Sequence, residues 1–240
     1  MSKPEELSAS AKKLITSDWA NLFPSLGVYK PMWLLKRHGP LLMGILLERT
    51  RSNDVYLPCF HVHNLLVPSS TIALSLVYPV PNPRQPRLPR EIKVLRHKDD
   101  YLAAVDFLKE AVPDLAKPTL TWDRLVQLHG DFIRQRRDYA VAKFCAGLFR
   151  DVILLAHWCG HEVYARHCQM EALRLMKGWN PPVDIESWKA VLNVQCDRNT
   201  LQLTLDAEIT KHKLEKVPVC ELTGAGDAES ITSVYTAAWT

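Results

Sequence analysis

Three histidines and two cysteines lie within thirteen residues, in the stretch AHWCGHEVYARHC (156–168). Imidazole nitrogen and thiolate sulfur are preferred zinc ligands, and histidines four residues apart on a helix can bind one ion together. Successive helical residues are rotated by about 100°, so His157, His161 and Cys168 would share one face of a continuous helix. The spacing makes His157 and His161 candidate zinc ligands.

A strand predicted in VYLPCFHVHN (55–64) carries further groups of the same kind. Cys59, His61 and His63 are two residues apart, so their side chains project from one face of the strand. A zinc site between this strand and the histidine helix is geometrically conceivable. Nothing in the sequence indicates that the two faces meet.

The pattern around the two histidines favours a packed helix over a metal site. Their stripe continues through Ile153, Tyr164, Ala172 and Leu175, as in a buried helix face. Cys168 would lie roughly 10 Å along the axis from His161, whereas zinc ligands lie about 2.0 to 2.3 Å from the ion. The HExxH metalloprotease pattern is absent. We therefore expect no cofactor and keep zinc as an alternative.

Two groups of arginines are candidates for binding a partner. Arg84, Arg87 and Arg90 repeat every third residue among prolines, which is the period of a polyproline II helix. Such a segment could bind a phosphate backbone or an aromatic groove, or act as a stiff linker. Near the end of a predicted helix lie Arg134, Arg136 and Arg137, whose charges also complement the helix dipole.

The predicted elements define an α+β fold with four parts. Residues 1–80 hold an amphipathic helix (8–22) and an antiparallel meander, and residues 81–98 are expected to be an extended Pro/Arg-rich crossover. Residues 99–220 hold helices, with Gly147 and Gly160 as candidate breaks. A β-hairpin follows, in which alternating apolar residues flank Asp197 to Asn199. Residues 221–240 are a polar linker and an apolar tail.

Composition is that of an ordinary globular protein, with 47% hydrophobic and 23% charged residues in 240. The apolar runs fall short of the roughly 20 residues of a membrane span, and the N-terminal residues contain no apolar signal segment. The six cysteines lack CxxC spacing, which is typical of reduced thiols. These features predict a cytoplasmic protein that does not associate with membranes.

The sequence carries no Walker loop, GxGxxG after a strand, GxSxG elbow or EF-hand loop, and no catalytic residues are predicted. We therefore expect a non-enzymatic module that binds another protein, as a subunit or adaptor. The polyproline arginines and the tail residues Tyr235 and Trp239 are its expected contacts. The alternatives are a nucleic-acid-binding protein that uses the two arginine groups, and a zinc-dependent enzyme or zinc-stabilised domain.

Overall fold

The computed structural model describes residues 7–72, 75–136, 142–178 and 184–224. The chain forms two units, and each draws on separate stretches of sequence. Unit 1 comprises Met1–His63, Leu74–Thr119 and Leu214–Glu221, and unit 2 comprises Asn64–Ala73, Leu120–Lys213 and Leu222–Thr240. No helix among the described residues is both long and apolar enough to cross a membrane.

A mixed sheet of eight strands contains the meander expected from the sequence. The strands are β1 (Gly27–Lys30), β2 (Trp33–His38), β3 (Leu41–Arg49), β4 (Val55–Asn64), β5 (Leu76–Pro79), β6 (Ile92–Lys93), β7 (Thr119–Thr121) and β8 (Val219–Thr223). Their order is β5-β4-β3-β2-β8-β7, with β1 paired to β2 and β6 to β4. The α+β class, with its N-terminal helix and antiparallel meander, is confirmed.

Close approach of β2 and β3 depends on Gly44. The two strands pair antiparallel from Trp33 with Leu46 to His38 with Leu41. A Cβ atom added at Gly44 would lie 2.0 Å from the carbonyl oxygen of Leu34, which is too close for any side chain. Glycine at this position therefore lets the two strands pair without distortion.

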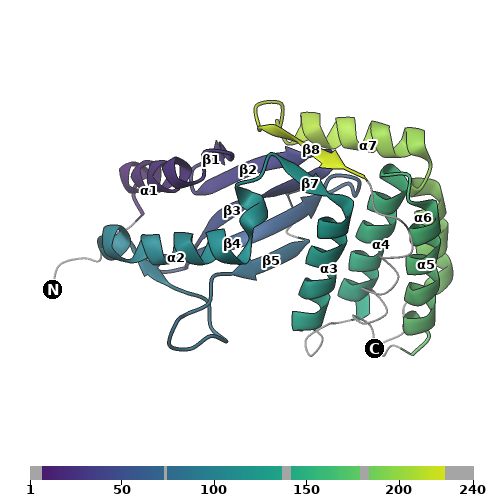
Figure 1. Ribbon diagram of the computed structural model, residues 1–240, viewed down its shortest axis with the longest axis horizontal. Coiled ribbons are helices and arrows are strands. Elements are labelled where there is room, and N and C mark those ends of the chain that lie inside the picture. The colour runs from purple at the N-terminus through teal and green to yellow at the C-terminus, as the bar shows by residue number, and fades with distance from the viewer. Residues whose placement is uncertain (1–6, 73–74, 137–141, 179–183, 225–240) are drawn as a thin grey trace. The chain divides into compact units, whose positions relative to one another are not determined.

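Two helices of unit 1 contact the same strand. They are α1 (Ala9–Leu22) and α2 (His97–Ala111), separated in the chain by the strands (Figure 1). The side chain of Ser8 accepts a hydrogen bond from the backbone N–H of Ala11 and caps α1. Trp19 of α1 and His97 of α2 both bond to Tyr56 of β4. This shared contact places the two helices on one face of the sheet.

The Pro/Arg-rich segment does not form the expected polyproline II helix. Pro81 and Pro89 form a β-bridge, and the N–H of Asn82 donates to the carbonyl of Leu88 at 2.9 Å, so the segment is a closed loop. Asn82 also accepts the backbone N–H of Arg84 on its side-chain oxygen. Polyproline II has no internal hydrogen bonds, whereas asparagine stabilises turns by bonding to the following backbone.

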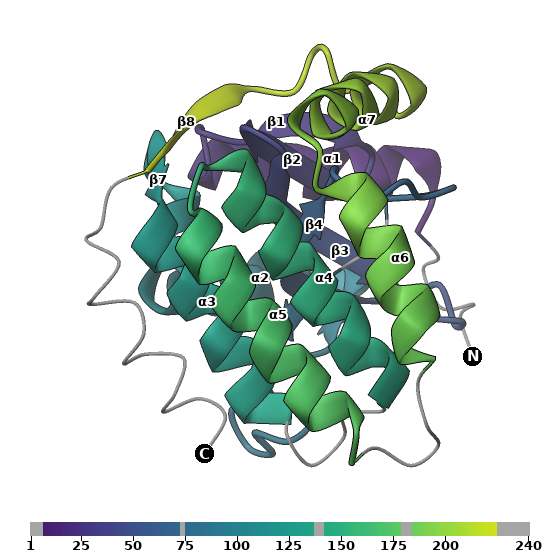
Figure 2. The ribbon, with the colours of Figure 1, turned by 90° about the vertical axis from the view of Figure 1, so that its right-hand side faces the viewer.

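Unit 2 is helical (Figure 2). Its helices are α3 (Trp122–Arg136), α4 (Ala142–Trp158), α5 (Glu162–Met176), α6 (Ile185–Gln195) and α7 (Arg198–Lys211). Helix α3 has one apolar face, on which Trp122, Leu125, Val126 and Phe132 are buried. Of the two candidate breaks, Gly160 has φ +79°, a value that glycine adopts without strain, and separates α4 from α5. The other, Gly147, lies within α4 and does not interrupt it.

The predicted C-terminal β-hairpin is wrong. Residues 185–195 and 198–211 form the helices α6 and α7. Asp197, expected in a β-turn, is instead the N-cap of α7 and accepts the backbone N–H of Thr200. Buried Leu201, Leu205 and Glu208 follow the three- and four-residue spacing of a helix, and this pattern coincides with the alternation that suggested strands.

Candidate functional site

A pocket of about 580 Å³ lies in unit 1, where the β1–β2 turn meets the end of β3 and the turn that follows. Met32 and Asn53, which line the pocket from the two turns, have left-handed backbone conformations, with φ 70° and 60°. Its lining is Lys30, Pro31, Met32, Trp33, Leu46, Leu47, Glu48, Arg49, Thr50, Arg51 and Asn53. Pockets of about 300 to 1,000 Å³ are typical of ligand sites.

Positive charge dominates the mouth of this pocket. Lys30, Arg49 and Arg51 are exposed, whereas Glu48 is the acidic residue of the lining. The Lys30 ammonium lies 4.8 Å from the centre of the Tyr29 ring, within the range of a cation–π contact. The three cations give the pocket the chemistry to bind an anionic group such as a phosphate.

Trp33 gives the same pocket a fixed aromatic wall. Its indole Nε1 donates a hydrogen bond to Nε2 of His61 at 2.6 Å. The Tyr29 ring meets it edge-on, with centroids 5.4 Å apart. Trp33 is partly exposed while these two contacts hold it. An exposed, oriented indole is suited to stacking on a flat ligand.

His61, behind Trp33, is completely buried on β4. Burial lowers the pKa of His61 to about 3, with a smaller contribution from His63, so the ring is neutral at physiological pH. Indole donates but does not accept, and His61 must therefore accept at Nε2 and carry its proton on Nδ1. That Nδ1 is buried and makes no hydrogen bond within the described residues.

The three side chains predicted to share a face of β4, Cys59, His61 and His63, are all buried. Cys59 is buried and donates its thiol to the carbonyl of Leu46. Burial raises the pKa of Cys59 to about 12, so the free thiol is protonated at neutral pH. Among the described residues, no group of three or more His, Cys, Asp or Glu side chains is placed to hold a metal ion.

A second buried histidine of unit 1, His97, lies within a continuous hydrogen-bonded network. The Trp19 indole donates to the Tyr56 hydroxyl at 3.3 Å, and that hydroxyl lies 2.7 Å from Nδ1 of His97. Nε2 of His97 lies 2.9 Å from the carboxylate of Asp18, which Lys98 also contacts at 2.7 Å. A carboxylate only accepts, so His97 donates from Nε2 and accepts from Tyr56.

The pKa values of both Asp18 and His97 lie below their ordinary values in this network. Burial raises the pKa of Asp18, but the hydrogen bonds from Lys98 and His97 outweigh it and the net shift is downward. Desolvation lowers the pKa of His97 despite the opposing effect of Asp18. Tyr56 is fully buried, and through Trp19 and His97 the network fastens α1 and α2 to β4.

The two predicted zinc ligands do not share a helix. His157 lies near the end of α4, and His161 is the residue before α5, beyond the Gly160 break. Nδ1 of His157 lies 2.9 Å from the carboxylate of Glu162. The His161 ring stacks on Trp122, with centroids 4.6 Å apart. The two histidines therefore do not share one continuous helix face, and both are partly buried.

The predicted arginine contacts differ in their surroundings. Arg84 and Arg87 are exposed on the loop between β5 and β6, whereas the partly buried Arg90 donates to the backbone carbonyl of Asp100. The side chains of Arg134 and Arg136 lie outside the described residues. Arg137, Tyr235 and Trp239 also lie outside them. The proposed protein contacts of the tail therefore stay a prediction.

Sequence reasoning missed the pocket residues. Lys30 and Trp33 flank Pro31 at one turn, and Arg49 and Arg51 flank another. In the sequence, the three cations are recognisable only by their place beside turn residues at the ends of predicted strands. They become a site only through the strand pairing, which brings the two turns to the same end of the sheet.

Comparison with protein-family models found no match to this chain, and comparisons with curated proteins and with solved structures found no similar protein. The functional argument therefore rests on the geometry and charge of the chain itself.

Proposed function

We propose that the protein binds nucleic acid through unit 1, with Lys30, Arg49 and Arg51 contacting phosphates. The observation that carries this proposal is their convergence around one pocket from two turns that are distant in sequence. Lysine and arginine contacts to phosphate supply most sequence-independent affinity for nucleic acid. The aromatic side chain of Trp33 beside the cations adds a surface on which a nucleic-acid base can stack.

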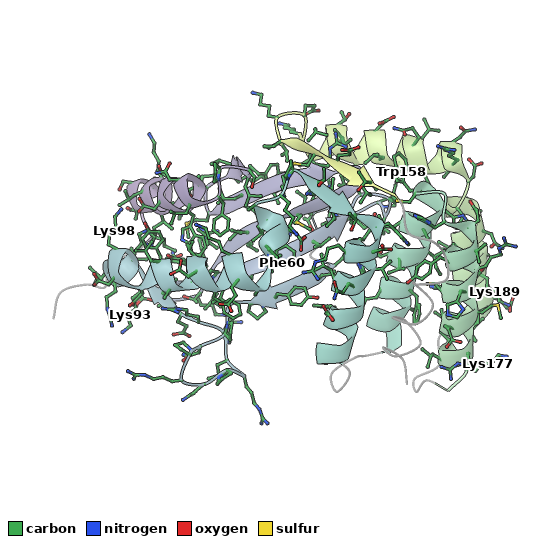
Figure 3. All side chains as sticks on the ribbon, viewed as in Figure 1. Phe60, Lys93, Lys98, Trp158, Lys177 and Lys189 are labelled. Atoms are coloured by element: carbon green, nitrogen blue, oxygen red, sulfur yellow. The ribbon has the colours of Figure 1, made fainter. Side chains whose placement is uncertain are left out.

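The distribution of charge supports the same proposal. The formal net charge of +4 falls entirely within unit 1, because the basic and acidic residues of unit 2 balance. Lys93 pairs with Val55 across β6 and β4, close to the turn that carries Arg51. Lys93 is exposed and extends outward at one end of unit 1 (Figure 3). This cation would prolong the path of a phosphate backbone beyond the pocket.

Salt-dependent binding tests the proposal. Fluorescence anisotropy with a labelled oligonucleotide, from about 50 to about 200 mM salt, should show affinity falling as salt rises. Three phosphate contacts on a single strand predict a log–log slope of about −2. The double variant Arg49→Ala/Arg51→Ala should reduce both affinity and slope.

An exposed arginine on α7 of unit 2 provides the control. Arg198→Ala removes a similar charge and should leave the affinity and the slope unchanged. Absence of binding by the folded protein at low salt would refute the proposal. Equal losses in the unit 1 double variant and in Arg198→Ala would refute the assignment to unit 1.

A further inference from the structure

We propose that the pocket of unit 1 binds an unpaired nucleobase stacked on Trp33, and that His61 is the positioning residue that orients the indole. The inference rests on the proposed nucleic-acid binding and specifies its ligand as single-stranded DNA or RNA. It assigns a role to a buried histidine that the phosphate contacts do not use.

The lining of the pocket combines the two chemistries of a nucleotide. Trp33 offers an aromatic surface, and Lys30, Arg49 and Arg51 offer cations at the same mouth. In a duplex the faces of the bases are covered by their neighbours, so only an unpaired base can present its face to an indole. The pocket volume of about 580 Å³ falls within the range of sites that hold drug-sized ligands.

Orientation of the indole depends on one hydrogen bond. A partly exposed tryptophan would otherwise exchange between rotamers, and each exchange would turn its face away from the pocket. The 2.6 Å bond from Nε1 of Trp33 to Nε2 of His61 selects one orientation, because indole has a single polar hydrogen. Tyr29 packs against the indole nearly at a right angle, with ring centroids 5.4 Å apart. A pre-oriented ring loses less entropy when the base stacks on it.

The identity of the residue at position 61 follows from the same bond. The acceptor must be buried and neutral, since a protonated imidazole could not accept from the indole. His61 is completely buried, which keeps it in the neutral form. Glutamine retains a side-chain acceptor, whereas leucine fills similar space without one. The pair His61→Gln and His61→Leu therefore separates hydrogen bonding from packing.

Three probes of about equal length test the inference on the full chain: oligothymidine, the same backbone with abasic sites, and a duplex. The wild type should bind oligothymidine on the order of tenfold more tightly than the abasic strand, as expected for stacking on an aromatic side chain. It should also prefer oligothymidine to the duplex. Trp33→Leu should lose the base preference while keeping the salt slope, because the phosphate contacts remain.

The His61 variants test the positioning role. His61→Leu should reduce the base preference at an unchanged salt slope, and His61→Gln should restore most of it. Trp33→Phe keeps an aromatic face but has no N–H, so His61→Leu should cause no further loss in that background. Base preference is the ratio of the affinities for oligothymidine and the abasic strand. A variant with a smaller folded fraction lowers both apparent affinities equally, so the ratio is unaffected.

Each contrary outcome identifies what fails. If the wild type binds the abasic strand as tightly as oligothymidine, and Arg49→Ala/Arg51→Ala still weakens both, the base pocket is refuted while nucleic-acid binding stands. If neither strand binds, both proposals fail. If His61→Leu and His61→Gln reduce the base preference equally, or neither changes it, the positioning role of His61 is refuted.

Discussion

His61 and His97 are both buried in unit 1, yet their hydrogen bonds hold different parts of the structure. His97 bonds through both nitrogens, to Tyr56 on one side and Asp18 on the other. Among the residues that the structure describes, His61 bonds through Nε2 alone, and that bond holds a side chain lining an open pocket. His97 connects secondary-structure elements, whereas His61 supports a surface that faces solvent.

The hydrogen bonds of a buried histidine indicate its role. A ring with both nitrogens bonded stabilises the fold, because every polar atom that lost water has gained a partner. A ring with an unbonded buried nitrogen carries a cost that packing alone does not require. His61 carries this cost while its other nitrogen orients Trp33. Stability and ligand binding should therefore respond differently to changes at positions 61 and 97.

The largest expected effect is on folding, from His97→Leu. The change leaves the Tyr56 hydroxyl without its acceptor and removes one donor from Asp18, both at buried or nearly buried positions. Urea denaturation should show a loss of about 3 kcal/mol in the free energy of unfolding. Nucleic-acid affinity of the folded protein should be unchanged, and a parallel loss of affinity would contradict the separation of the two histidines.

Acid should destabilise the protein through His61. Its folded pKa of about 3 lies below the ordinary value of 6.5, so the unfolded chain binds a proton that the folded chain excludes. Stability therefore falls as pH is lowered from 6.5 towards 3, by about 2 kcal/mol between neutral pH and about pH 5. Chemical denaturation at several pH values measures this loss, which His61→Gln should remove. An unaltered pH dependence in that variant would count against the assignment.

A smaller loss is expected from Tyr56→Phe. The variant keeps the ring but removes the hydroxyl that accepts from Trp19 and bonds to His97. Thermal and urea unfolding should show a decrease of about 1 to 2 kcal/mol, below that of His97→Leu, because the bond between His97 and Asp18 survives. A loss greater than that of His97→Leu would show that Tyr56, rather than His97, is the centre of the network.

The smallest effect on folding should come from Arg49→Ala, since Arg49 is exposed. Its unfolding free energy should change by less than about 0.5 kcal/mol. The salt slope for a single strand should nevertheless decrease by about 0.7, which corresponds to one phosphate contact. Titrations at several salt concentrations measure the slope, and an unchanged slope would remove Arg49 from the interface.

Local sequence signals predicted much of the fold. The N-terminal helix and the meander follow from apolar periodicity, and the break at Gly160 follows from glycine. The hairpin prediction failed because apolar residues in α6 and α7 also alternate, and because aspartate is common both in turns and at helix N-caps.

The candidate site was not predictable in the same way. The sequence directed attention to His157 and His161, which Gly160 separates, and to an arginine period that the bonds of Asn82 fold into a loop. Lys30, Trp33 and Arg49 meet only after β2 pairs with β3. The bond from Trp33 to His61 spans 28 residues and has no local signature. The predictions of a protein partner and of bound zinc have not been tested.

Strand β8 has a consequence for how the chain is made. It pairs parallel to β2, with Val219 beside Arg37 and Cys220 beside His38. A ribosome that adds about 5 to 20 residues per second would deliver this strand on the order of ten seconds after its neighbour. Until then the end of β2 at Arg37 and His38, beyond its pairing with β1, lacks this partner strand, and the nascent chain carries a short unpaired edge open to aggregation. A chaperone that shields this edge during synthesis should therefore raise the yield of folded protein.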